Sequence, residues 1–185
     1  MRTIVRQALV ATAAATLTAT LVAAPAHAEG VRVDDGADAT ASLTDIRVVR
    51  ARHSDDRVSV KVNFPDLRKQ SAASMSIFVD TDDAANGPEY VLGTPLFSGS
   101  DYALWRMANW RLTGSEPVDC RYGMTYRWRR DFVVFSARRG CFQRPDEVRI
   151  GLRMRDDADG SHPVIDWLKG RRQFTRWLDA GASNA

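Results

Sequence analysis

Short runs of alternating apolar and polar residues are the feature that most restricts the fold of this 185-residue chain. The clearest run spans 57–64, where polar residues alternate with Val58, Val60, Val62 and Phe64. Successive side chains of a β-strand point to opposite faces, so a period of two predicts a strand that is buried on one face. The same alternation recurs in residues 75–79, 122–129 and 148–154.

Further strands are predicted for residues 44–52, 89–92, 102–110 and 132–135. Such strands follow one another at intervals of about ten residues, with Gly, Pro and Asp between them. This spacing predicts an all-β fold, an antiparallel β-sandwich of about eight strands with jelly-roll or immunoglobulin-like topology. A closed barrel is the main alternative. In the tail, Phe174, Trp177 and Leu178 have the spacing of a short C-terminal helix, and an edge strand is the other interpretation.

The N-terminal residues have the pattern of a secretory signal peptide. Arg2 and Arg6 precede an uncharged stretch of Ala, Leu, Val and Thr over residues 8–24. Pro25 and the small residues Ala26 and Ala28 then form a signal-peptidase site, so residues 1–28 are predicted to be removed. The four threonines dilute the stretch and argue against a retained transmembrane anchor. We therefore expect a secreted protein, either extracellular or associated with the cell envelope.

The predicted mature chain divides into a flexible leader with at most a short first strand, residues 29–42, and one β-sandwich domain, residues 43–180. The predicted signal holds two of the 26 basic residues and none of the 23 acidic residues, so the whole-chain charge of +3 falls to +1. A nucleic-acid-binding domain usually carries a clustered excess of cations. Near-neutrality therefore argues against nucleic acid as a partner.

Two cysteines, Cys120 and Cys141, are present in the chain. An even pair in an exported protein predicts a disulfide. A metal pair or a catalytic thiol is less favoured, because neither His53 nor His162 lies near a cysteine in the sequence. We therefore expect a Cys120–Cys141 bridge.

An acidic segment directly follows the predicted strand at 75–79. Within residues 80–89, the side chains of Asp80, Asp82, Asn86 and Glu89 offer oxygens of the kind that calcium prefers. The segment lacks the glycine position of an EF-hand. An ordinary acidic turn, in which Asp and Asn bond to their own backbone, is the alternative interpretation. Structural calcium at these four residues is the one cofactor that the sequence suggests.

Aromatic residues lie on several predicted strands. If Trp105, Tyr126 and Trp128 were exposed, they could stack against sugar rings while neighbouring arginines bind hydroxyl or carboxylate groups. The alternative is that these rings fill the core of the sandwich. The alternating Arg149 and Arg153 are interpreted as part of a solvated sheet face.

The sequence contains no G-x-S-x-G or H-E-x-x-H motif and no cysteine free for nucleophilic chemistry. We therefore assign no catalytic residue. Carboxylates such as Asp82 and Glu89 could in principle hydrolyse a glycoside, and this leaves a small secreted hydrolase or inhibitor-like protein as an alternative function.

Two segments, 77–82 with 87–90 and 138–142 with 145–154, resemble a group of uncharacterised secreted proteins of actinobacteria. The order of strand, acidic loop and aromatic strands is also loosely similar to carbohydrate-binding sandwiches of the family 9 and DOMON kind. The resemblance implies a jelly-roll or immunoglobulin-like sandwich with structural calcium, and it carries over no ligand-binding residue. With the residue patterns above, it leads us to expect a non-enzymatic binding module for an extracellular glycan or protein.

Overall fold

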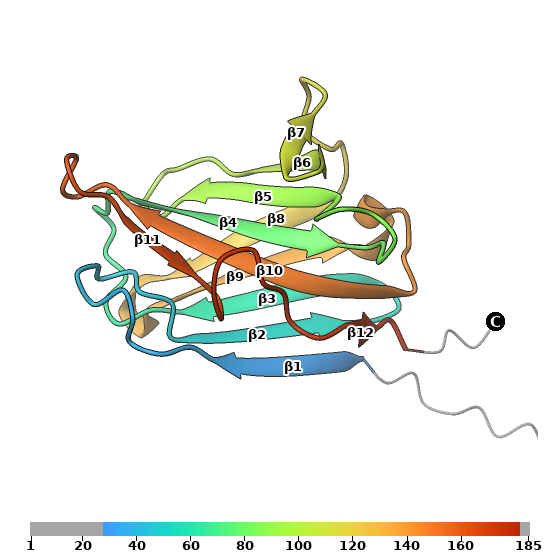
Figure 1. Cartoon of the computed structure of the whole chain (residues 1–185), viewed down its shortest axis with the longest axis horizontal. Helices are drawn as coiled ribbons and strands as arrows, with labels where there is room; N and C mark the ends of the chain where they lie inside the picture. The colour runs from blue at the N-terminus through green and yellow to red at the C-terminus, as the bar shows by residue number, and fades with distance from the viewer. Residues whose placement is uncertain (1–27, 182–185) are drawn as a thin grey trace, which may run out of the picture.

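The alternating apolar residues form the inner faces of two antiparallel sheets that pack against each other (Figure 1). This arrangement is seen in a computed structural model, which describes residues 28–181. The first sheet has five strands in the spatial order β1 (Glu29–Asp34), β2 (Val48–His53), β3 (Arg57–Asn63), β9 (Phe132–Arg138) and β8 (Tyr122–Arg127). The expected β-sandwich is therefore confirmed.

The second sheet has seven strands. Its main path runs in the spatial order β11 (Val164–Trp167), β10 (Glu147–Asp156), β4 (Ala73–Asp80), β5 (Tyr90–Pro95), β6 (Ala103–Ala108) and β7 (Arg111–Thr113). The short strand β12 (Leu178–Asp179) pairs with the start of β10. Figure 1 shows the β6–β7 hairpin projecting from the edge of this sheet.

The core lies between the sheets and contains the side chains that the alternation predicts to be inward. On β3 these are Val58, Val60 and Val62, which are fully buried. On β10 of the other sheet they are Val148, Ile150, Leu152 and Met154, which are also fully buried. Burial of each such side chain contributes about 1.5–3 kcal/mol, so these paired inner faces hold the sandwich together.

The structure contains more strands than the sequence pattern indicates, twelve in residues 28–181 rather than about eight. The additional strands, β1, β7, β11 and β12, are two to six residues long, and β1, β7 and β11 lie at sheet edges. Residues 29–34 form β1 and pair with β2, so the segment expected as a leader contains the short first strand that the sequence allowed.

The described part of the tail has no α-helix, and it ends in the edge strand β12. Just before β12, the chain crosses β10, where Thr175 forms two hydrogen bonds with the backbone of Ile150. The Thr175 N–H donates to the Ile150 carbonyl at 2.9 Å, and the Ile150 N–H donates to Thr175 Oγ1 at 3.0 Å. These bonds fix an extended conformation, and so the edge-strand interpretation of the tail is the correct one.

The predicted disulfide joins Cys120, which lies just before β8, to Cys141 in the short 3₁₀ helix η2 (Arg139–Phe142). The two Cα atoms are 5.5 Å apart. The bridge therefore closes the two ends of the β8–β9 hairpin, which lies at one edge of the five-stranded sheet.

The predicted signal peptide lies outside the described residues, apart from Ala28, so export stays a prediction. Within residues 28–181, the structure has no helix whose length and apolar character would let it span a membrane.

Candidate functional site

The outer face of the seven-stranded sheet carries a groove between aromatic and arginine side chains. In the sheet register, Arg153 on β10 lies between Trp167 on β11 and Ser76 on β4, and Ser76 lies opposite Gly93. Directly opposite residues share a face, so these side chains gather on one surface. The resulting sheet-face groove has a volume of about 410 Å³ and is lined by Ser76, Phe78, Val91, Gly93, Trp105, Met107, Trp110, Leu112, Arg153, Trp167, Arg171 and Arg172.

Three aromatic rings pack together at one side of the groove. Phe78 and Trp167 stack with their ring centroids 5.6 Å apart and an interplanar angle of 9°. Trp110 meets the Phe78 ring edge-on at 5.2 Å and the Trp167 ring at 6.0 Å. Such pairs stabilise one another beyond their buried area, by about 0.5–1.5 kcal/mol each. The aromatic side of the groove is therefore preorganised.

The position of Trp110 depends on two turns. Asn109 and Trp110 have positive φ angles of 51° and 63°, which suits a tight two-residue turn between β6 and β7. The Trp110 ring then lies against Gly87 of the acidic segment, where a Cβ atom would come within 2.5 Å of Trp110 Nε1. Gly87 itself has a φ of +87°, a conformation that glycine adopts readily. The acidic segment thus supports the aromatic side of the groove.

The floor of the groove is formed in part by small residues. A Cβ atom added to Gly93 would meet no other atom within 4 Å, so the space above this residue is open. Trp105 lies opposite Val91 on the neighbouring strand and is half-buried. The floor is therefore open enough for a ligand to reach the aromatic rings.

The arginines of the groove have no acidic partner. Within the described residues, no ion pair involves Arg153, Arg171 or Arg172. Arg153 is half-buried, and its Nε is buried without a hydrogen-bond partner. Burial, and then the charge of Arg155, lower the pKa of Arg153. An unpaired cation in this position is costly unless an anion binds to it.

Two of the groove arginines also lie over indole rings. The Arg153 guanidinium carbon is 5.8 Å from the ring centroid of Trp167, and that of Arg172 is 5.1 Å from the Trp110 ring. A cation over an aromatic face is held electrostatically, by about 0.5–1 kcal/mol at an exposed site. These contacts orient the guanidinium groups beside the open floor.

Arg149, two outward positions before Arg153 on β10, is held by other residues. Its Nε donates to Asp80 Oδ2 at 2.8 Å, and its guanidinium lies 4.4 Å from the Trp177 ring and 4.9 Å from the Phe174 ring. Arg149 and Arg153 are therefore half-buried rather than solvated as the sequence suggested. Because Asp80 pairs with Arg149, the cations in the groove that lack an acidic partner are Arg153, Arg171 and Arg172.

In the predicted calcium segment, the carboxylates bind groups of the protein. Asp80 is fully buried beside Arg149, and its pKa is raised, chiefly by burial. The Asp82 Oδ1 accepts the Ala84 N–H at 3.0 Å, and the Glu89 Oε2 accepts the Thr81 N–H at 2.7 Å. These bonds are typical of an acidic turn.

Asn86, the fourth predicted ligand, is exposed on the same turn. Within residues 28–181, the group of acids whose oxygens come close enough to share an ion contains none of the four predicted residues. Calcium in the segment 80–89 stays a prediction.

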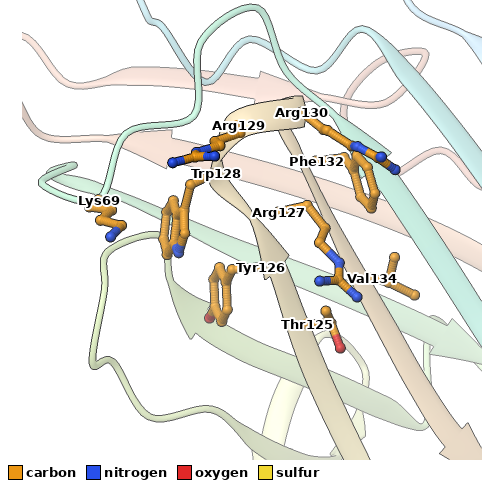
Figure 2. A pocket seen from close by; sticks show the side chains of 9 residues that line it. All are labelled: Lys69, Thr125, Tyr126, Arg127, Trp128, Arg129, Arg130, Phe132 and Val134. Atoms are coloured by element: carbon orange, nitrogen blue, oxygen red, sulfur yellow. The ribbon is translucent and has the colours of Figure 1, made fainter.

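Tyr126 and Trp128 lie together, but in a different pocket from Trp105. Their rings stack with centroids 5.0 Å apart and an interplanar angle of 9°. Figure 2 shows the two rings side by side on one side of β8, with Arg127 and Thr125 on the other. The pocket has a volume of about 870 Å³ and is lined by Lys69, Thr125, Tyr126, Arg127, Trp128, Arg129, Arg130, Phe132 and Val134. The three aromatics therefore do not form one surface row.

The Tyr126–Trp128 pair is partly a structural element. The Tyr126 hydroxyl donates to the Pro95 carbonyl at 3.2 Å and also contacts Thr94 Oγ1 on β5 of the other sheet. Both rings pack against the core as half-buried side chains. The pair therefore anchors the edge strand β8 to the second sheet.

Neither His53 nor His162 lies in a catalytic arrangement. His53 is fully buried, with Nδ1 2.8 Å from the Leu178 carbonyl. His162 is exposed in a loop, where its Nδ1 contacts both Ser161 Oγ at 3.0 Å and Asp159 Oδ2 at 3.3 Å. A Ser-His-Asp relay uses different ring nitrogens for the serine and the aspartate, so this loop does not form one.

Sequence reasoning named Trp105 but did not assign Phe78, Trp110, Arg153 or Trp167 to a binding site. One signal was available, because Phe78 interrupts the alternation of 75–79 with a large apolar residue at an outward position. Arg171 and Arg172 reach the groove from the irregular tail, which no periodicity describes. No known protein-family model matches this chain, and a search among curated proteins gives no match.

Proposed function

We propose that this domain is a non-enzymatic binding module that takes an acidic polysaccharide in the sheet-face groove. The observation that carries the proposal is Arg153, a half-buried guanidinium with an unpartnered Nε beside three tryptophans and two further arginines. A ligand with flat apolar faces and negative groups would satisfy both kinds of side chain. The predicted signal peptide agrees with a ligand outside the cell.

The aromatic part of the groove supports a sugar ligand. The C–H faces of a pyranose ring are apolar, and indole rings provide flat apolar surfaces with a polar N–H at the edge. Trp105, Trp110 and Trp167 all line the same groove. An open groove on a sheet face also suits a polymer, which must enter and leave at both ends.

The arginines support an acidic sugar over a neutral one. Guanidinium groups bind carboxylates through paired hydrogen bonds, which are stronger than bonds between neutral groups. Arg153, Arg171 and Arg172 line the groove without an acid among the lining residues. A uronic acid polymer offers one carboxylate per charged sugar and therefore matches this pattern. A protein ligand with acidic and aromatic side chains is the alternative within the same binding function.

A small hydrolase or inhibitor-like protein that uses the acidic segment has less support. The pocket beside that segment contains Asp82, Glu89 and Arg106, but its lining includes neither histidine. Glu89 already accepts both the N–H and the hydroxyl of Thr81. That carboxylate oxygen is therefore already bonded within the turn, whereas a general acid or base must direct an oxygen at its substrate.

Affinity electrophoresis and calorimetry with polygalacturonate, with neutral dextran as the comparison, test the proposal. Binding to polygalacturonate should weaken as salt rises, because counterions screen the arginines. Arg153→Met removes the charge with a side chain of similar length. It should lower the affinity at least tenfold, since a charge-assisted hydrogen bond contributes about 1.5–3 kcal/mol.

Arg127→Met is the matched control, because Arg127 lines the pocket with Tyr126 and Trp128 on the other sheet. This variant should bind polygalacturonate like the wild type. The proposal would be overturned if no acidic polysaccharide bound. A loss of affinity in Arg127→Met but not in Arg153→Met would move the ligand to the other pocket.

A further inference from the structure

A group of four aspartates lies where the loop between β1 and β2 meets β11. Asp35, Asp38 and Asp45 come from this loop, and Asp166 comes from β11 in the other sheet. One carboxylate oxygen from each of Asp35, Asp38 and Asp166 lies within 4.8 Å of the others. Sequence analysis did not find this group, because its members are far apart in the chain.

Backbone N–H groups orient three of these carboxylates, each through one oxygen. The Ile46 N–H donates to Asp166 Oδ2 at 2.7 Å, the Lys169 N–H to Asp35 Oδ1 at 3.2 Å, and the Ala39 N–H to Asp45 Oδ1 at 3.3 Å. In each case the second oxygen is buried and has no hydrogen-bond partner. The protein thus holds the carboxylates in place and leaves one oxygen of each available.

The burial of the unpartnered oxygens is the observation that points to a ligand. Asp166 is 3% exposed and Asp45 is 1% exposed. A buried carboxylate oxygen without a partner costs free energy, and repulsion between like charges adds to this cost. Burial, and then the charges of the nearby Asp38, Asp35 and Asp45, raise the pKa of Asp166 to about 7.

Nearby cations do not satisfy the group. Arg47 is exposed toward solvent, and its Nη1 is 3.6 Å from Asp45 Oδ2, beyond hydrogen-bond distance. Lys169 contributes only its backbone N–H among the described contacts. Asp45 therefore has a weak partner in Arg47, whereas the free oxygens of Asp35 and Asp166 have none.

We propose that Asp35, Asp38 and Asp166 bind a divalent cation of the calcium type, with Asp45 as a neighbouring charge. All the available ligands are oxygens, which hard cations prefer, and zinc usually requires nitrogen or sulfur ligands. Calcium accepts irregular geometry with waters completing its shell, and magnesium demands a near-ideal octahedron. Two ligands on a loop and one on a strand suit the less demanding ion.

The site joins the two sheets. The loop that carries Asp35 and Asp38 follows β1 of the five-stranded sheet, and Asp166 belongs to β11 of the seven-stranded sheet. A bound cation would therefore cross-link the layers at this end of the sandwich. The expected consequence is higher thermal stability rather than a part in ligand chemistry.

Two measurements test the site on protein that has been treated with EDTA. The first is calorimetric titration with calcium, and the second is a set of melting curves with and without calcium. Extracellular calcium modules bind with Kd values of about 10⁻⁴–10⁻³ M. At a calcium concentration of ~100 times Kd, the Tm should rise by roughly 5–10 °C. Asp166→Asn keeps an acceptor for the Ile46 N–H and should abolish this rise.

Two exposed aspartates give a matched pair of variants that leave the core unchanged. Asp38→Asn should weaken calcium binding at least tenfold, and Asp82→Asn in the acidic segment should leave it unchanged. A calcium concentration of about 10 mM is well above the Kd of the weakest extracellular calcium sites. If neither binding heat nor a Tm shift appears at that concentration, the proposal is overturned. The proposal is also overturned if the calcium-dependent rise in Tm is lost in Asp82→Asn and kept in Asp38→Asn. That result would place calcium in the segment 80–89.

Discussion

Among single residues, His53 on β2 connects the stability of the domain to pH. It is fully buried, its Nδ1 is bonded to the Leu178 carbonyl, and its Nε2 is buried with no partner. Burial is the main cause that lowers the pKa of His53 below its ordinary value of 6.5. Below that pH the unfolded chain binds a proton that the folded protein does not. The free energy of unfolding should therefore fall as the pH drops below about 6.5.

Urea unfolding at a series of pH values between 7 and 5 measures this dependence. His53→Gln is the reference variant, because its amide can still donate to the Leu178 carbonyl but cannot be protonated. The pKa values of Asp80 and Asp166 are raised, so these two groups make the free energy of unfolding rise as the pH falls. Both groups are present in the wild type and in the variant. The difference between the two proteins isolates His53. Parallel curves for wild type and variant would contradict the assignment.

Among the elements, the β6–β7 hairpin and the acidic turn depend on each other through Trp110 and Gly87. Gly87→Ala puts a methyl group against the Trp110 indole and places alanine at a positive φ. The variant should lose about 1–3 kcal/mol of stability and bind polygalacturonate more weakly, because Trp110 must move.

Gly93→Ala is the control, since its added Cβ meets no atom within 4 Å. Its stability should change by less than about 0.5 kcal/mol in urea unfolding. Equal stability of the two variants would refute the coupling.

The elements that sequence could predict are the strands with a strong period of two. Residues 57–64 and 148–154 alternate because one face of each strand is buried in the core. A period of two shows which side chains share one face of a strand, but it does not show to which of the two sheets the strand belongs. Trp105 and Trp128 therefore looked equivalent in the sequence. Trp105 lies on β6 of the seven-stranded sheet, whereas Trp128 begins the short 3₁₀ helix η1 (Trp128–Arg130) that follows β8 of the five-stranded sheet. The strands β7 and β12 are three and two residues long, too short to show any period.

The groove and the aspartate group could not be predicted for a related reason. Both depend on which strands become neighbours, and strand order is set by packing across the whole domain. Arg153 meets Trp167 only because β11 pairs with β10, and Asp166 meets Asp35 only because the β1–β2 loop reaches the other sheet. The disulfide was predictable because the described chain has one pair of cysteines.

At the scale of the whole molecule, the disulfide and the groove belong to different sheets. The bridge closes the β8–β9 hairpin of the five-stranded sheet, and the groove lies on the outer face of the seven-stranded sheet. Replacing both cysteines, Cys120→Ser with Cys141→Ser, should destabilise the fold by about 3 kcal/mol, as expected for a loop of this size. The Tm should fall by roughly 6–12 °C.

Ligand affinity should respond differently from stability in this double variant. Below the melting transition, polygalacturonate should bind it as tightly as the wild type, because the residues that line the groove include none from the bridged hairpin. Calorimetry at a temperature well below the lowered Tm measures this, with Arg153→Met as the variant in which affinity falls while the bridge stays intact. If the affinity fell with the bridge, the ligand would have to contact the β8–β9 hairpin. The pocket of Tyr126 and Trp128 would then be the binding site, because loss of the bridge loosens β8, which carries Tyr126 and leads directly into Trp128.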